Sequence, residues 1–276
     1  MIDTSIAFIG GGNMARSLIA GLVRQGMAPS RLHVAEPQPA LRAALAEEFG
    51  VSVHDDATAA AAQAPVWLLA VKPQVMREVC VSLQQQARTS APLVVSIAAG
   101  ITSAQLERWL GGGLPVVCAM PNTPALLGAG VTGLFATAQV STDQRAQADT
   151  VLATAGRTVW VDDEALMDSV TAVSGSGPAY VFLLAEAMEA AGVAQGLPVT
   201  AARTLVKQTL LGAARMLDEA GEPAAELRRR VTSPNGTTQA AIEAFQAGGF
   251  EALVADALRA AQARGQALSA ANDDAH

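Results

Sequence analysis

A glycine-rich turn near the beginning of the sequence constrains the fold more than any other feature. The apolar run Ile6–Ile9 leads directly into the segment Gly10-Gly11-Gly12-Asn13-Met14-Ala15, which matches the pattern G-x-G-x-x-A. A turn of this kind joins the first strand of a parallel sheet to the first helix, and its last small residue lets the helix pack closely on the strand. A glycine cluster alone is often a flexible loop. Here the strand before it and the amphipathic helix after it favour a turn that binds the pyrophosphate of a dinucleotide.

The first part of the chain alternates apolar β-type runs with helical stretches. This alternation predicts a parallel sheet wound by crossover helices. We expect strands at Ser5–Ile9, Arg31–Ala35, Val66–Val71, Leu93–Ile97, Val116–Met120, near Gly130–Ala136 and at Arg157–Val161. The spacing of apolar residues predicts helices at Asn13–Gln25, Pro39–Phe49, Gln74–Gln86 and Thr102–Leu110.

Strand patterns stop at about Glu164, and long segments rich in Ala, Leu, Glu and Arg follow. Turns containing Gly and Pro separate these segments, so the second half is expected to be all helix. The predicted fold class is therefore α/β, with an N-terminal Rossmann-type doubly wound sheet followed by an all-α C-terminal domain. Residues 1–162 are expected to form the dinucleotide-binding domain and residues 163–276 the helical domain. The tail from Ser269 to His276 has no periodic apolar face and is expected to fray.

Composition and charge argue against several classes of protein. Hydrophobic residues make up 51% of the chain, yet polar residues interrupt them before any run reaches the roughly 18 that a membrane span needs. The net charge of −7 gives no electropositive surface for nucleic acid, and the basic run Arg228–Arg230 is typical of a solvated helix face. Cys80 and Cys118 match no metal-ligand or redox spacing and are expected in the core. Met1-Ile2-Asp3 runs into a predicted strand without a signal-peptide pattern, so we expect a cytosolic protein.

Further strand ends carry residues suited to a dinucleotide, because ligands bind at the carboxyl edge of a parallel sheet. Glu36 ends the second strand about twenty residues after the turn, where its carboxylate would bind the adenosine ribose and favour NADH. A solvated loop carboxylate is the alternative. Lys72 closes the next strand, and the proline after it favours a role beside the dinucleotide over the alternative of a solvated lysine. Ser96–Gly100 ends another strand in small residues that admit a flat ring, and Asn122 lies in a proline-bounded turn suited to the nicotinamide. Ordinary turn chemistry would explain the last two segments as well.

Two turns rich in hydroxyl groups begin helices in the second half. The segment Ser174-Gly175-Ser176-Gly177-Pro178 precedes an apolar helix, and Pro178 occupies a position typical of a helix start. The segment Ser233-Pro234-Asn235-Gly236-Thr237-Thr238 repeats this arrangement. Free N–H groups at the two helix starts could hold a small carboxylate while a hydroxyl contacts the neighbouring atom. Simple capping of each helix is the alternative.

The available residues favour reduction of an imine over oxidation of an alcohol. Alcohol oxidation generally needs a base, but His33 is expected in a strand, His54 in a short link and His276 at the terminus. The β-hydroxyacid dehydrogenases, which share this plan, have Lys and Asn where Val181 and Ala185 stand here. A protonated cyclic imine is already electrophilic, so orientation, exclusion of water and one hydrogen bond from a threonine can suffice.

Six motifs, in order, resemble the pyrroline-5-carboxylate reductase family along essentially the whole chain. They are F-I-G-x-G-N-M at the start, A-V-K-P at Ala70–Pro73, S-I-A-A-G at Ser96–Gly100, M-P-N-T-P at Met120–Pro124, S-G-S-G-P-A-Y at Ser174–Tyr180 and S-P-x-G-T-T at Ser233–Thr238. The resemblance implies hydride transfer from NADPH or NADH to the C=N bond of L-Δ1-pyrroline-5-carboxylate, which yields L-proline. It also implies that the helical domain binds substrate and forms a homodimer or a ring of dimers.

The resemblance and the strand-end positions define a set of candidate site residues. Thr238 is the candidate catalytic residue, as a hydrogen-bond partner of the ring nitrogen. The candidate cofactor contacts are Ile9, Gly10, Gly11, Gly12, Asn13, Met14, Glu36, Ala70, Val71, Lys72, Pro73, Ala98, Ala99 and Asn122. The candidate substrate contacts are Glu164, Ser174, Gly175, Ser176, Gly177, Pro178, Gly236, Thr237 and Thr238. No metal is expected.

The sequence departs from the family pattern at three positions. Asn235 stands where the family usually has Gly, a change that Asn tolerates because it accepts positive φ. Ala57 replaces an asparagine that often helps to bind the adenosine end, and Glu36 stands where a small or basic residue commonly accepts the NADPH phosphate. Cofactor preference is therefore open. Two rival functions are another NAD(P)-dependent reductase or dehydrogenase of this plan, and a dinucleotide sensor without turnover.

Overall fold

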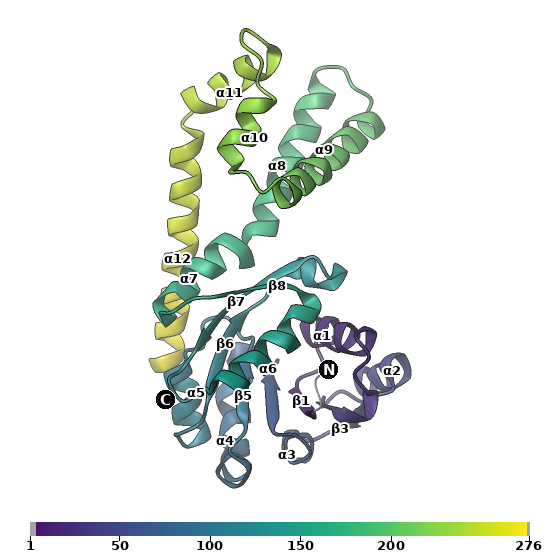
Figure 1. Ribbon diagram of the computed structural model, residues 1–276, viewed down its shortest axis with the longest axis vertical. Coiled ribbons are helices and arrows are strands. Elements are labelled where there is room, and N and C mark those ends of the chain that lie inside the picture. The colour runs from purple at the N-terminus through teal and green to yellow at the C-terminus, as the bar shows by residue number, and fades with distance from the viewer. Residues whose placement is uncertain (1–3, 275–276) are drawn as a thin grey trace. The chain divides into compact units, whose positions relative to one another are not determined.

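The computed structural model of the chain describes residues 4–274 (Figure 1). Its contacts group the chain into two compact units. The first contains the residues up to Ser176 together with those from Ala260 onward, and the second is Gly177–Arg259. These units reflect how the residues pack, whereas the boundary predicted after residue 162 concerns function. The functional boundary therefore stays a prediction.

The first unit is built on an eight-stranded sheet with the order β3-β2-β1-β4-β5-β6-β7-β8. Neighbouring strands are parallel except for β6 and β7, which are antiparallel. The strands are β1 (Ile6–Ile9), β2 (Leu32–Ala35), β3 (Ser52–His54), β4 (Val66–Leu69), β5 (Leu93–Ser96), β6 (Val116–Met120), β7 (Gly130–Ala136) and β8 (Gly156–Trp160). Because β1 lies between β2 and β4, successive connections leave it in opposite directions, as in a doubly wound sheet.

The central strands are buried on both faces, and their alternating residues contribute to two separate cores. Ile6 and Phe8 of β1 pack in one core, whereas Ala7 and Ile9 pack in the other. All four side chains are at most 1% exposed. Because successive side chains of a strand point to opposite faces, this division requires helices on both sides of the sheet.

The connections that cover the sheet are mainly helical (Figure 1). They are α1 (Asn13–Arg24), a 3₁₀ turn (Pro29–Arg31), α2 (Pro39–Phe49), α3 (Ala57–Ala61), α4 (Pro73–Ser90), α5 (Ser103–Leu110), a 3₁₀ turn (Thr123–Leu127), α6 (Thr142–Leu152) and a 3₁₀ turn (Ala153–Ala155). Every strand and helix predicted for this half is present. Three elements were not predicted, namely α3, α6 and β3, and β3 contains His54, which was expected in a link.

The described residues from Glu164 onward form helices and turns without a strand, which confirms the predicted fold class. The elements are a 3₁₀ turn (Glu164–Leu166), α7 (Met167–Val170), a π-helical turn (Thr171–Gly175), α8 (Gly177–Ala194), α9 (Val199–Glu219), α10 (Ala224–Arg230), α11 (Thr237–Ala247) and α12 (Phe250–Asp274). Within this part of the chain, no helix combines the length and apolar character needed to cross a membrane, and the same holds for the other described helices.

The last turns of α12 correct one prediction. The tail from Ser269 was expected to fray, but the helix continues through Asp274, and His276 lies outside the described residues. Asn272 Nδ2 donates to the carbonyl oxygen of Gly100 at 2.8 Å, and Gln105 Nε2 donates to the Ser269 carbonyl oxygen at 3.1 Å. These side-chain bonds stabilise helical turns that have no apolar face, which is why an apolar pattern could not predict them.

Candidate active site

The turn after β1 lies where the connections of the sheet diverge. Gly10 has a φ of 106°, and a Cβ at this residue would lie 2.8 Å from the carbonyl oxygen of Ala70, just after β4. Ala70 N donates to Ile9 O at 2.8 Å, which keeps the two strand ends together. Open α/β sheets bind ligands in the crevice at such a point. The fold itself therefore requires glycine at residue 10.

Gly12 is different, because nothing in the protein explains its lack of a side chain. Its φ of −69° and ψ of −178° suit any residue, and among the described residues no atom lies within 4 Å of a Cβ built there. No side chain caps α1 at this end, so the N–H groups and the positive helix end stay available to an anion. A pyrophosphate bound here would need the space, so the turn fits a dinucleotide.

Glu36 is a buried carboxylate at the end of β2, only 6% exposed. Its Oε2 accepts a hydrogen bond from Gly11 N at 3.1 Å, and its Oε1 accepts one from Gln38 N at 3.0 Å. Arg42 Nη1 donates to the carbonyl oxygens of Glu36 and Pro37 at 2.8 and 2.9 Å. The alternative of a solvated loop carboxylate is therefore wrong. The glycine turn itself holds the carboxylate beside the expected adenosine position.

The segment after β4 begins α4 next to the same turn. Pro73 is the first residue of α4, and Lys72 precedes it with an exposed side chain. Val71 lies against the turn, since its Cγ1 would be 3.1 Å from a Cβ on Gly10. The predicted cofactor residues from β1, β2 and β4 thus come together at one edge of the sheet.

The two described histidines lie next to each other. The rings of His33 on β2 and His54 on β3 have their centroids 5.7 Å apart.

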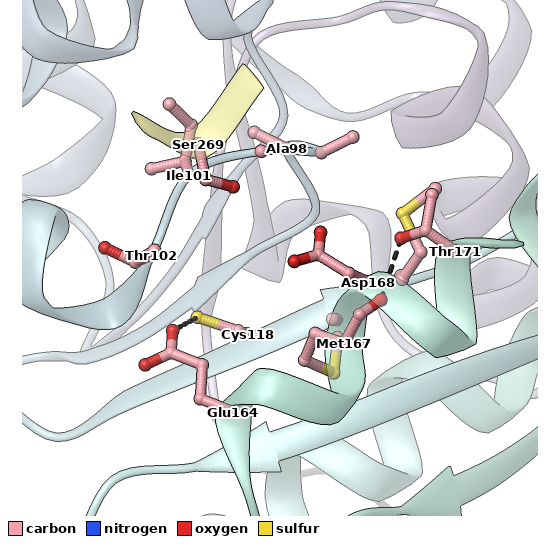
Figure 2. Close-up of a pocket in the computed structure, with 13 residues that line it drawn as sticks. Ala98, Ile101, Thr102, Cys118, Glu164, Met167, Asp168, Thr171 and Ser269 are labelled. Atoms are coloured by element: carbon pink, nitrogen blue, oxygen red, sulfur yellow. Dashed lines mark hydrogen bonds between the residues drawn. The ribbon is translucent and has the colours of Figure 1, made fainter. Parts of the chain in front are cut away.

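A cavity of about 60 Å³ lies beside the loop Ala98–Thr102 that follows β5 (Figure 2). Figure 2 shows Glu164 and Asp168 reaching it from the segment that begins the helical half. Glu164 Oε1 accepts from Ser103 N at 2.6 Å, and its Oε2 accepts from Ser103 Oγ at 2.7 Å. The carboxylate therefore binds the first turn of α5, where a negative charge is favourable.

Burial raises the pKa of two groups at this cavity, Cys118 and Asp168. The Cys118 thiol donates to Glu164 Oε1 at 3.5 Å. Burial, together with the adjacent Glu164 carboxylate, raises the pKa of Cys118 well above its ordinary value, so the thiol stays protonated. Burial also raises the pKa of Asp168. Cys118 and Cys80 are both buried and free, as predicted for core residues.

Asn122 uses both ends of its amide within the protein. Its Oδ1 accepts from Val131 N at 3.0 Å, and its Nδ2 donates to the carbonyl oxygen of Ser174 at 3.2 Å. The side chain is 9% exposed. Asn122 therefore joins the end of β6 to the start of β7 and to the π-helical turn, in addition to any contact that it makes with a cofactor.

The Ser174–Pro178 segment is more helical than predicted. Pro178 does lie in the first turn of α8, and the predicted hydroxyl-rich turn before it is a π-helical turn that continues from α7. Ser174 Oγ donates to Val170 O at 2.9 Å, and Ser176 N donates to Thr171 O at 2.8 Å. These groups are satisfied internally, so they would bind a carboxylate only by exchanging partners.

The start of α11 is the second predicted substrate element and lies in the second unit. Gly236 is the N-cap residue and offers no side-chain cap, so the capping alternative does not apply to Thr237 or Thr238. Both threonine side chains are exposed. Asn235 adopts a φ of 58°, which confirms that Asn is accepted there through positive φ. The helix start thus presents free N–H groups and two hydroxyls.

Sequence reasoning missed three residues that line or support the cavity. Ser103 holds Glu164, and the segment Thr102-Ser103-Ala104-Gln105 carries a recognisable capping-box pattern that could have identified this helix start. Asp168 and Asn272 have no such signal. Their roles depend on which distant segments pack beside them.

The sheet, the uncapped glycine turn and the following helical region define an NAD(P)-dependent oxidoreductase of the two-domain class. Residues 164–268 match the family described as pyrroline-5-carboxylate reductase dimerisation, and residues 5–100 match the family described as NADP oxidoreductase, coenzyme F420-dependent. The pyrroline-5-carboxylate reductase of Pseudomonas aeruginosa is 53% identical over 269 residues, covering 98% of each chain. That of Escherichia coli is 37% identical, covering 97% of this chain and 99% of the relative.

Solved structures agree with these relatives. A pyrroline-5-carboxylate reductase from Coxiella burnetii is 41% identical and superposes with a TM-score of 0.93, covering 96% of this chain and 98% of that one. The Plasmodium falciparum pyrroline carboxylate reductase, solved with NADP bound, is 26% identical with a TM-score of 0.84, covering 98% and 99%. The chain belongs to the pyrroline-5-carboxylate reductase family and is an NAD(P)H-dependent oxidoreductase.

Proposed function

We propose that the chain reduces the C=N bond of L-Δ1-pyrroline-5-carboxylate to give L-proline, the last step of proline biosynthesis. The observation that carries this proposal is the 53% identity to a pyrroline-5-carboxylate reductase over 98% of both chains. The start of α1 at Gly12, which has no side-chain cap and has space beside it, supports the binding of a dinucleotide cofactor. NAD(P)H, when bound, supplies the hydride.

The cofactor is held by the edge of the sheet in this proposal. The N–H groups at the start of α1 bind the pyrophosphate, and Glu36 binds the adenosine ribose. Val71 and Lys72 flank the turn, and Ala98 and Ala99 lie against the nicotinamide. The remaining proposed contacts are Ile9, Gly10, Gly11, Gly12, Asn13, Met14, Ala70, Pro73 and Asn122.

The substrate carboxylate is bound by helix starts. The N–H group of Thr237 at the start of α11 has no side-chain cap, which suits an anion. Gly236 N donates to Ser233 O at 3.0 Å, so it would contact the carboxylate only by exchanging this partner. The Thr238 hydroxyl donates a hydrogen bond to the ring nitrogen as that atom becomes an amine. The remaining catalysis comes from the orientation of the substrate relative to the nicotinamide. Glu164 borders the site and is held there by its hydrogen bonds with Ser103 at the start of α5. Residues Ser174–Pro178 complete the contacts with the substrate carboxylate after a local rearrangement.

The proposal extends to organisation and location. Residues 1–162 serve the dinucleotide, while residues 163–276 serve the substrate and self-association. The dimerisation match over residues 164–268 supports self-association, and we propose a homodimer or a ring of dimers. The protein acts in the cytosol.

A cofactor-oxidation assay tests the function. Purified protein is supplied with pyrroline-5-carboxylate and either NADH or NADPH. In the reverse direction it is supplied with a panel of 2- and 3-hydroxy acids and either NAD+ or NADP+. We expect turnover with pyrroline-5-carboxylate and formation of proline. Turnover confined to the hydroxy acids would identify a dehydrogenase instead. Saturable NAD(P)H binding without any turnover would identify a sensor.

A further inference from the structure

The loop Ala98–Thr102, between β5 and α5, is held at several points by hydrogen bonds. Near its start, Ala98 N donates to Ser96 Oγ at 3.4 Å. At its end, Thr102 and Gln105 form a capping box, with Thr102 N donating to Gln105 Oε1 at 2.9 Å. The exposed Ala99 lies between these anchors. If such a loop is to orient a ligand, the backbone conformation between its fixed ends must be held as well.

The last turns of α12 contact the middle of this loop. Asn272 Nδ2 donates to the carbonyl oxygen of Gly100 at 2.8 Å. Gly100 has a φ of 71°, and a Cβ there would lie 3.4 Å from Leu268 Cβ. Figure 2 shows Ser269 of the same helix next to Ile101 at the rim of the cavity. The helix therefore covers the loop at the one residue whose backbone conformation is unusual.

Gln105 connects the end of the loop to the last turns of α12. Its side chain is 2% exposed, its Oε1 holds Thr102 N, and its Nε2 donates to the Ser269 carbonyl oxygen at 3.1 Å. A buried amide with both ends bonded is fixed in orientation. The positions of loop and helix end are therefore coupled through side chains that do not themselves point to a ligand.

We propose that Asn272 is a positioning residue for the reaction, because the end of α12 sets the conformation of the loop against which the nicotinamide lies. This inference rests on the proposed function, in which Ala98 and Ala99 contact the ring. Residues 269–272 lie beyond the segment that matches the dimerisation family. The anchored loop places the ring for hydride transfer, whereas the adenosine and pyrophosphate ends are held elsewhere on the sheet.

The test compares Asn272→Ala and Asn272→Asp with Gln266→Ala, a change at an exposed residue of the same helix. The aspartate variant keeps the shape but cannot donate, and its charge faces the Gly100 carbonyl oxygen. We expect kcat to fall roughly tenfold for the alanine variant, since small misplacements of reacting groups cost this much or more, and further for the aspartate variant. The deuterium isotope effect on kcat with 4-deuterated NADH should rise, while the NADH dissociation constant changes much less.

Unchanged kcat in Asn272→Asp, or a loss no greater than the loss of folded protein measured by NADH-binding stoichiometry, would overturn the proposal. An unaltered isotope effect alongside a lower kcat would do so too. Should the wild type lack activity on pyrroline-5-carboxylate, the proposed function fails separately. The fluorescence of bound NADH then decides the loop proposal, which requires a changed emission in Asn272→Ala and none in Gln266→Ala.

Discussion

Two glycines of the turn after β1 have different physical reasons to be glycine. Gly10 needs its positive φ and its close approach to Ala70. Gly12 has neither requirement within the protein. The sequence pattern predicts both glycines equally, but only the structure separates the one that serves folding from the one that leaves room for a ligand.

Gly12→Ala is expected to weaken NAD(P)H binding by at least roughly tenfold while leaving the melting temperature unchanged. The added methyl group has free space among the described residues but would occupy the position that we propose for the pyrophosphate. Fluorescence titration and thermal unfolding measure the two effects. Gly10→Ala is the contrast, because it should lower the melting temperature. Equal thermal losses in the two variants would contradict this division of roles.

Thr238→Ala is expected to lower kcat by roughly one to three powers of ten, because the variant cannot form the hydrogen bond that we propose to the developing amine. NAD(P)H binding should be largely kept. Steady-state kinetics with pyrroline-5-carboxylate provide the measurement. Thr204→Ala, at another exposed helical threonine of the second unit, is the matched control. Wild-type turnover in Thr238→Ala would remove this hydroxyl from the mechanism.

Glu36→Ser is expected to shift preference toward NADPH by at least roughly tenfold in the ratio of kcat/KM values, because a fixed carboxylate repels a 2′-phosphate. Arg42, in the first turn of α2 and bonded to the Glu36 and Pro37 carbonyl oxygens, would then be the cation expected to meet the phosphate. Glu47→Ser, at an exposed position of α2, controls for the change of net charge. An unchanged ratio would show that Glu36 does not discriminate.

At the scale of elements, apolar periodicity was enough to predict the strands and helices that are mostly buried. The strands around β1 are buried on both faces, so their apolar runs were visible in the sequence. β3 has three residues, all half-buried, and α3 is a five-residue run of mostly alanine, so neither carries a clear pattern. The end of α12 depends on hydrogen bonds between distant segments. The π-helical turn combines local bonds with the distant bond from Asn122. Apolar periodicity reports neither.

Gly265→Ala is expected to destabilise the contact between α12 and α7. A Cβ at Gly265 would lie 2.5 Å from Asp168 Oδ1, so the carboxylate must move. Thermal unfolding should show a lower melting temperature, and Asp168→Ala in the same chain should restore part of it. Gly212→Ala, at a helical glycine where no described atom lies within 4 Å of the added Cβ, should be neutral or stabilising. Additive effects of Gly265→Ala and Asp168→Ala would argue against a direct clash.

At the scale of the whole molecule, residues 177–259 expose most of their apolar surface. Across this range, all of it described, the buried hydrophobic side chains are Ala202, Val206 and Leu227. The successive residues Tyr180–Leu184 are between 36% and 68% exposed, so this part of α8 is apolar and exposed around its whole circumference. A helix that is apolar all round is normally buried. This exposure agrees with the dimerisation match over the same segment.

Phe182→Glu is expected to shift the protein toward monomer, because Phe182 is 68% exposed in the single chain and a charge would be buried on association. Sedimentation velocity over a range of concentrations measures the change. Val75→Glu, at an exposed apolar residue of α4 in the sheet unit, is the control and should sediment like the wild type. An unaltered distribution for Phe182→Glu would place the interface elsewhere.

The scarcity of buried apolar side chains among residues 177–259 has a thermodynamic consequence. A segment that gains its apolar burial from other copies is folded by mass action, so its free energy of unfolding contains the logarithm of protein concentration. Dilution would then act on it as a denaturant does, while the sheet, with its own two cores, would be indifferent to dilution. For residues 177–259, folding and assembly would then be one equilibrium.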